Sequence, residues 1–237
     1  MNPFKHGYLL VCLIMITLVS SAQETITRTL PAFHGLSVMG KMRVELYKSD
    51  SSRVILSVSN ASAENIITEV KDSLLNIRLK TDTNKSAVIK VQVYYSFLTD
   101  ITVAANAILL SPEILTAESI KFTARSGAKM ELELDLKSIK ADVKQGGILV
   151  FTGKTTLQDV RVNTGATYSA YRLQAEDTHV TAISGSKAKV CASRIIDATS
   201  TTKSYVGYIG VPVSVYMKTS FGGVIASFAN EDAVFED

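Results

Sequence analysis

Three carboxylates stand at alternate positions in one segment of the chain. Glu131, Glu133 and Asp135 alternate with apolar residues, so in a β-strand they would share one face. Such a row could hold calcium or bind a polyuronate chain. About 19 residues further on, at the positions that would stack on the row, stand Val150 and Thr152. We therefore favour a solvated outer face, and whether the row binds a cation stays open.

Residues suited to nucleophilic catalysis or to binding a transition metal are scattered. After residue 22 the chain has two histidines, His34 and His179, and one cysteine, Cys191. Neither histidine stands in a pattern typical of a triad or a metal site, and we interpret both as surface or capping residues. Cys191 continues an alternation with Lys187 and Lys189, and if that register holds its thiol faces outward, where it could pair with another chain. The interpretation that we favour is a small, half-buried residue. We predict no catalytic residues, no metal and no cofactor.

Tyrosines gather in the last third of the sequence. If they stack on one another, they would form a strip that binds sugar rings or a protein partner. The alternative is an aromatic ladder that fills the interior. Our candidate binding face comprises Tyr205, Tyr208 and Tyr216.

These side chains are carried by a degenerate repeat. Its signature is a glycine between small residues, as in Ser126-Gly127-Ala128 and Thr164-Gly165-Ala166, and successive central glycines are 19, 19 and 20 residues apart. A period this short is typical of a solenoid, in which stacked units bury a continuous core. Each unit can supply about three short strands and three corners. We predict an all-β fold, a three-sided parallel β-helix with about 20 residues per coil.

The glycines mark tight corners at which φ is positive. Asparagine is the commonest substitute, so Ala105-Asn106-Ala107 is placed in the same series. The predicted structural corners are Asn106, Gly127, Gly146, Gly165, Gly185 and Gly222. The unit at Thr201–Ser204 has no glycine, which predicts a changed or strained corner.

The chain divides into four segments. Residues 1–22 have a short charged start, an apolar run and small residues before a cut after Ala22, as in a secretory signal peptide. Residues 23–97 show strand alternation without the repeat, residues 98–230 carry the repeating coils, and residues 231–237 form an acidic tail that covers or trails from the last coil. We treat residues 23–237 as one domain, with no transmembrane segment after cleavage. The formal net charge is +3 and no basic cluster is interleaved with aromatics, so nucleic acid is not expected as a partner.

The order of the motifs resembles a family, the putative autotransporter adhesin, head GIN domain family, which is common among secreted proteins of the Bacteroidetes and has no established function. Phe33–Gly40 is similar to its opening F-x-G-I-x-V-x-G, Glu69–Leu79 to its hairpin, and Tyr208–Pro212 to its closing Y-x-G-x-P. The serial small-Gly-small corners are similar as well. Asn106, Gln145 and the corner at Thr202 depart from the pattern. The resemblance implies a right-handed β-helix and an envelope location, and it supplies no catalytic residues.

These observations predict a non-catalytic protein exported to the periplasm, the outer-membrane surface or the medium, where a rigid surface binds a glycan or an envelope or host protein. The first alternative is a structural module that assembles with copies of itself. The second is a polysaccharide-active enzyme, because parallel β-helices often carry such activities.

Overall fold

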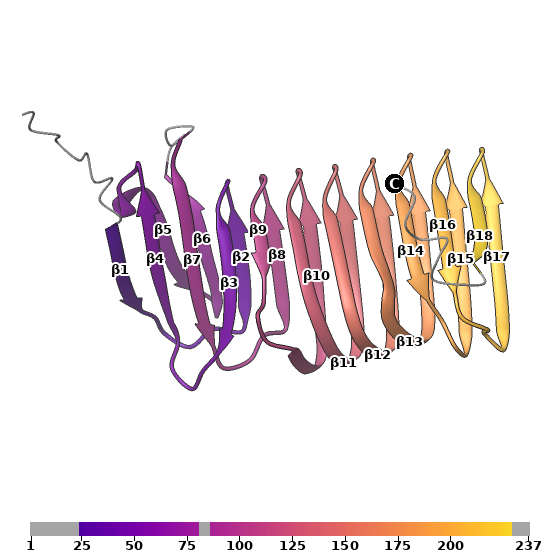
Figure 1. Ribbon diagram of the computed structural model, residues 1–237, viewed down its shortest axis with the longest axis horizontal. Coiled ribbons are helices and arrows are strands. Elements are labelled where there is room, and N and C mark those ends of the chain that lie inside the picture. Colours follow the sequence, from indigo (N-terminus) through magenta and orange to yellow (C-terminus); the bar gives the residue numbers. More distant parts are fainter. Residues whose placement is uncertain (1–23, 81–85, 229–237) are drawn as a thin grey trace, which may run out of the picture.

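The computed structural model describes residues 24–80 and 86–228, which form an all-β solenoid of about seven turns with about 19 residues per turn (Figure 1). The described part contains no α-helix, only the short 3-10 helix η1 (Ala63–Asn65). The segment predicted as a signal peptide and the acidic tail lie outside the described residues.

The strands form two long walls that run along the solenoid axis. Wall A consists, from the N-terminal end onward, of β1 (Glu24–Thr29), β4 (Arg53–Ser59), β7 (Val88–Tyr95), β3 (Arg43–Lys48), β9 (Ile108–Leu110), the first parts of β11 (Lys129–Lys144), β12 (Ile148–Asn163) and β13 (Thr167–Ile183), then β14 (Lys187–Cys191), β16 (Tyr205–Ile209) and β18 (Val224–Phe228). Wall B consists of β5 (Ile66–Lys71), β6 (Leu74–Leu79), β2 (Gly35–Met39), β8 (Asp100–Ala104), β10 (Leu115–Arg125), the last parts of β11, β12 and β13, then β15 (Ile195–Thr201) and β17 (Ser214–Ser220).

The core lies between the walls and, apart from the end strands β1, β17 and β18, consists mainly of every second residue along the strands. In wall B, for example, Phe122, Ala141 and Val160 follow one another in register, and all are buried. In this row the ring of Phe122 lies next to the small side chain of Ala141, in coils stacked at about 4.8 Å. Phe151 packs between Phe122 and Tyr168, with ring centroids 4.8 and 5.8 Å away.

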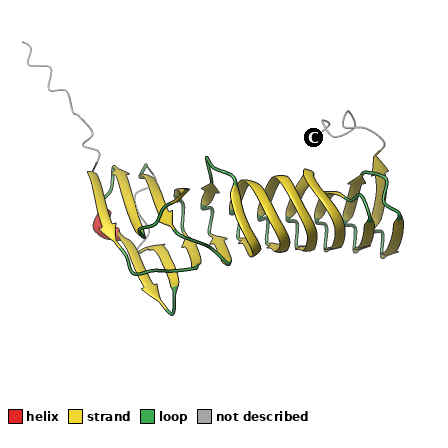
Figure 2. Cartoon of the chain, turned by 90° about the horizontal axis from the view of Figure 1, so that it is seen from below, coloured by secondary structure: helices red, strands yellow, loops and turns green. Residues whose placement is uncertain are grey.

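The coils are continuous rather than divided into separate short strands. β11, β12 and β13 each run unbroken for 16 or 17 residues from one tight corner to the next, as the long ribbons in Figure 2 show. At each bend the register of paired residues skips one position, at Glu118, Lys137 and Thr156, and resumes at the next residue. The single step of 20 residues is absorbed by a bulge, in which Ala170 and Tyr171 together stand opposite Phe151.

The solenoid begins earlier than the repeat indicates. β2 and β3 already form a coil, stacked between β6 and β7 on one side and β8 and β9 on the other (Figure 1). The boundary predicted at residues 97 and 98 is therefore not a structural one. It was misplaced because the corner of this first coil, at Gly40, lacks the small-Gly-small signature. Only β1, β4 and β5 depart from the parallel pattern, pairing antiparallel with their neighbours.

Polar side chains close the N-terminal end. Arg28 on β1 donates from Nη1 to the carbonyl oxygen of Ile66 at 2.7 Å and to Oγ1 of Thr68 at 2.8 Å, and from Nη2 to the carbonyl oxygen of Ala63 at 3.0 Å. Glu24 accepts the amide of Ala63 at 2.8 Å. Charged side chains placed this way satisfy backbone groups at the end and discourage pairing with another chain.

From Ala105 onward, each tight corner is made by two consecutive residues in the left-handed region. The first has φ between 49° and 57° and the second between 58° and 78°, as in type I′ turns. Asn106, Gly127, Gly146, Gly165, Gly185 and Gly222 all occupy the second position. The corner without glycine has the same geometry, with Thr202 at φ 55° and Lys203 at φ 58°. It is thus strained rather than changed in shape, since a side chain there costs about 1–2 kcal/mol.

Replacing Lys203 by glycine should raise the free energy of unfolding by about 0.5–1 kcal/mol, because the relief of strain exceeds the extra entropy that glycine loses on folding. The reverse change at an open corner, Gly185→Lys, should lower it by a similar amount. Urea denaturation of both variants measures this. A less stable Lys203→Gly protein would show that the Lys203 side chain makes a stabilising contact that outweighs its strain.

A candidate binding groove along the coils

The carboxylate row faces solvent. Glu131, Glu133 and Asp135 point outward from β11, and in register with the first two stand Val150 and Thr152 on β12, as the sequence indicated. Glu131 forms an ion pair with Lys129, and Asp135 lies 3.3 Å from Nζ of Lys154. Within residues 24–80 and 86–228, no three His, Cys, Asp or Glu side chains group so that they could hold a metal ion.

The three candidate tyrosines do not share a face. Tyr205 and Tyr208 lie on β16 but point in opposite directions, so Tyr208 is buried in the core, with 8% of its surface exposed. Tyr216 is exposed on β17, which belongs to the other wall. The proposed tyrosine face is therefore wrong, because an odd separation along a strand places two side chains on opposite sides.

The two histidines are both exposed and stand on separate parts of the solenoid. His34 is exposed just before β2, where its ring stacks on Phe97 at 5.7 Å. His179 lies on the outer face of wall B with Nδ1 3.7 Å from Oδ2 of Asp197. Both positions agree with the surface interpretation.

A groove follows the side of the solenoid opposite to the tight corners, where each coil passes from wall A to wall B. It has a volume of about 890 Å³. It crosses β10, β11, β12 and β13 and ends beside Cys191 and Ser193. No motif in the sequence marks this groove.

Three rows of side chains line this coil groove, and two of them follow the parallel register. The middle row is the floor, and it is small or buried: Ala117, Leu136, Thr155 and Ala175. One rim is polar: Thr116, Asp135, Lys154 and Gln174. The opposite rim lies one residue beyond the floor in each coil: Glu118, Lys137, Thr156 and Glu176.

Charges on both rims are paired between neighbouring coils. Lys154 lies 3.3 Å from Asp135 on one rim, and Lys137 lies 2.8 Å from Glu118 on the other. All four side chains are solvent-exposed, so these pairs add little stability. They do hold hydrogen-bond donors and acceptors at fixed positions along both rims.

Cys191 closes one end of the coil groove. Its side chain is on the outer side of β14, as the alternation with the lysines indicates, and it is half-buried. Burial raises the pKa of the thiol, and a hydrogen bond with the backbone of Ala175 lowers it in part. The thiol therefore stays protonated at neutral pH.

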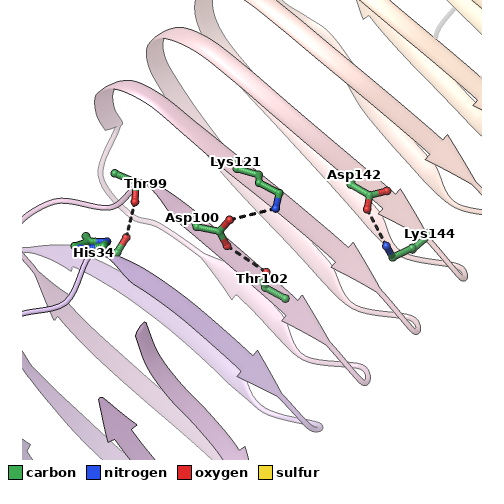
Figure 3. A network of polar contacts seen from close by, with 7 residues as sticks. All are labelled: His34, Thr99, Asp100, Thr102, Lys121, Asp142 and Lys144. Carbon is green, nitrogen blue, oxygen red and sulfur yellow. Dashed lines mark hydrogen bonds and ion pairs between the residues drawn. The ribbon is translucent and has the colours of Figure 1, made fainter. Parts of the chain in front are cut away.

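The outer face of wall B carries a second polar surface. Asp100 lies between Lys121, 3.6 Å away, and Thr102, whose Oγ1 donates at 3.3 Å (Figure 3). Two coils further along, Lys144 donates to Asp142 at 2.8 Å. A hollow of about 450 Å³ lies on the same face, lined by charged side chains of both signs together with Ala141, Val160 and Thr181.

Residues 32–212 match the family described as "Putative auto-transporter adhesin, head GIN domain". The chain belongs to this family. The match begins just before β2, includes every coil up to β16 and contains the whole coil groove.

Solved structures share the fold of this head GIN domain. One of a putative adhesin from Bacteroides fragilis NCTC 9343 is 14% identical, with a TM-score of 0.80 over 88% of this chain and 98% of that one. A putative adhesin from Parabacteroides merdae ATCC 43184 is 14% identical, with a TM-score of 0.71 over 89% and 98%. A putative lipid binding protein from Parabacteroides distasonis ATCC 8503 is 15% identical, with a TM-score of 0.69 over 89% and 98%.

No match was found among curated proteins. In the part of the chain that the structure describes, no helix has the length and apolar character needed to cross a membrane.

Proposed function

We propose that this head GIN domain is an exported, non-catalytic binding protein of the cell envelope that holds a carbohydrate chain in the coil groove. The observation that carries the proposal is the pair of polar rims on either side of a floor of small or buried residues. The family description, which names an adhesin, supports the general class.

The spacing of the groove favours a polymer with a short repeat. Side chains recur along each rim at the coil step of about 4.8 Å, fixed by the parallel hydrogen-bonded ladder. This step is similar in length to one sugar unit of an extended polysaccharide. Because the rims belong to a rigid solenoid, a bound chain would meet positioned groups without ordering a loop.

The side chains of the two rims suit a ligand rich in hydroxyl groups better than a ligand that carries charges of one sign. Lys154 and Gln174 are donors in register on neighbouring coils, while Glu118 and Glu176 supply acceptors on the opposite rim. The ion pairs at Lys137 and Lys154 balance opposite charges within the groove. A sugar hydroxyl both donates and accepts, and the apolar faces of sugar rings suit a floor that includes Ala117 and Ala175.

The export part of the proposal rests on the apolar run and small residues before Ala22. The mass of the protein recovered from the envelope or the medium would give Gln23 as its first residue. Recovery with residues 1–22 still attached would contradict cleavage at this point.

The functional test is a glycan array of bacterial polysaccharides and host mucins, probed with residues 23–237 while each bound glycan is monitored for cleavage. We expect binding without turnover. The groove variant Lys154→Ala/Gln174→Ala should bind about tenfold more weakly, because two hydrogen-bonding groups are lost. The matched control Lys187→Ala/Thr167→Ala removes a similar pair, also in register on neighbouring coils, from the outer face of wall A, and should bind like the parent.

Three results would count against the proposal. Cleavage of a bound glycan would favour the polysaccharide-active enzyme. Equal loss of binding in the groove variant and the control would place the ligand elsewhere. No binding to any glycan, together with self-association in solution, would favour the structural module.

A further inference from the structure

The last described coil of the solenoid is apolar, exposed and poor in charge. Of the twelve large apolar side chains that are exposed within residues 24–80 and 86–228, seven lie between residues 211 and 224. Residues 210–228 carry one charged side chain, Lys218, whereas the same length of chain at residues 129–147 carries eight. A surface that gathers apolar side chains and lacks charges is typical of the core of a protein interface.

This coil also ends in free strand edges. β17 pairs with β15 and β18 with β16, and no described strand lies on their other side (the yellow strands in Figure 1). Val215 and Met217 on β17 stand in register with Ile196 and Ala198, which are fully buried, yet 48% and 45% of their own surfaces are exposed. A partner of this end therefore has to supply both backbone hydrogen bonds and apolar contacts. Another strand edge supplies both, whereas a lipid surface leaves the backbone groups unsatisfied.

The edge that fits is the same end of a second copy. The N-terminal end is a poor partner, because Arg28 and Glu24 already close it with hydrogen bonds to backbone groups. Contact between unlike ends would also continue into an open filament, whereas contact between two like ends closes after two copies.

The last coil has the symmetry that such a pair needs. The amide of Gly223 donates to the carbonyl oxygen of Ser220 at 3.0 Å and closes the corner between β17 and β18. Met217, the middle residue of β17, stands three residues before Ser220, and Ala226, the middle residue of β18, stands three residues after Gly223. One two-fold axis perpendicular to the walls can thus pass through the centres of both strands, so that each strand pairs antiparallel with its own copy along its full length.

We propose that two copies of the chain pair end to end through β17 and β18 about this axis. On the inner side, Val215 faces Thr219 of the second copy, and the two Met217 side chains meet and continue the core. On the outer side, Tyr216 faces Lys218 of the second copy, which places each ammonium group beside an aromatic ring. An axis moved by one residue to Lys218 would instead set the two ammonium groups against each other.

Disulfide formation tests the register, in residues 23–237 with Cys191→Ser. Met217→Cys brings two thiols together, because Cα atoms that face each other in an antiparallel pair are about 4.5–5.5 Å apart, within the range of a disulfide. Val215→Cys is the matched control, since its two copies lie about 13 Å apart along the strands. We expect mild oxidation to convert most of the Met217→Cys protein, and little of the control, into a covalent dimer.

Sedimentation velocity measures the association itself. We expect the parent to be a dimer that dissociates on dilution. Met217→Asp should weaken the dimer about a hundredfold, because two carboxylates meet on the axis. Met39→Asp is the matched control: Met39 is 41% exposed on β2 of the same wall, away from the last coil, and this variant should dimerise like the parent.

Three results would overturn the proposal. A monomer at every concentration would exclude the second copy, and protection of the β17 amides from hydrogen exchange in that monomer would show that the chain covers its own end. Equal cross-linking of Met217→Cys and Val215→Cys would exclude the register. Equal weakening by Met217→Asp and Met39→Asp would place the interface elsewhere. None of these results depends on the coil groove, which crosses β10 to β13 and is tested by glycan binding.

Discussion

Replacing Gly153 by alanine should lower the free energy of unfolding by about 4 kcal/mol. Gly153 lies in the middle of β12 with φ at 103°, a conformation that side-chain-bearing residues rarely adopt. A Cβ atom there would also overlap the carbonyl oxygen of Leu134 in the neighbouring coil. Backbone strain of about 1–3 kcal/mol and overpacking of about 1–3 kcal/mol act together. Urea denaturation gives the value directly.

Gly165→Ala is the matched control for this change. Gly165 also has a positive φ, 66°, but nothing lies within 4 Å of the position its Cβ would take. Only backbone strain opposes the alanine here, so we expect the free energy of unfolding to fall by about 1 kcal/mol. Equal losses at the two glycines would contradict the close approach of β12 to β11.

Replacing Gln158 by alanine should lower the free energy of unfolding by about 4 kcal/mol. Gln158 is fully buried, and its Oε1 accepts the hydroxyl of Tyr168 at 2.8 Å. Its Nε2 donates to Oγ1 of Thr178 at 2.9 Å and to the carbonyl oxygen of Cys191 at 3.1 Å. The alanine leaves the tyrosine hydroxyl unpaired and opens a cavity, effects of about 1–3 and 2–5 kcal/mol respectively.

A double-mutant cycle separates the polar contribution from the cavity. Gln158→Leu keeps most of the volume but orphans the Tyr168 hydroxyl, and Tyr168→Phe orphans Gln158 Oε1. The double variant removes both groups, so it should lose less stability than the sum of the single variants. Additive losses would show that the two side chains are not energetically coupled. Gln174→Ala, an exposed glutamine on the neighbouring coil, should leave stability nearly unchanged.

The hydrogen bond between Gln158 and Tyr168 lies in a buried site, and this predicts how the stability of the fold depends on pH. Burial raises the pKa of Tyr168 above its ordinary value of 10.0. The unfolded chain therefore releases this proton first, so the stabilisation is fully present below pH 10 and decreases as the pH rises above it. Tyr168→Phe should flatten this alkaline decrease.

Most of the fold could be predicted from local patterns in the sequence. The repeated corners defined the coil length, and the alternation around Glu131 correctly gave both its outward direction and its neighbour Val150. The position of β2 and β3 between later strands could not be seen, because it depends on pairings between residues far apart in the chain. The error at Tyr205 and Tyr208 was avoidable, since their separation alone places them on opposite faces.

The coil groove was hidden for a different reason. Its rims are made of ordinary polar residues such as Thr156 and Gln174, and none of them stands in a recognisable motif. They become a surface only when the coil step aligns them and the bend between the walls spreads the two rims apart. A search for polar residues recurring every 19 or 20 positions would have found Asp135, Lys154 and Gln174.

The most direct test of the carbohydrate groove uses Cys191, the one cysteine in the described part of the chain. Its thiol lines one end of the groove, so a bound chain should shield it. The rate of maleimide modification would be measured at mildly alkaline pH, with and without a saturating glycan identified on the array. We predict that the glycan slows modification in the parent and in the Lys187→Ala/Thr167→Ala control. An unchanged rate at full saturation would place the ligand outside the groove and contradict the proposed function.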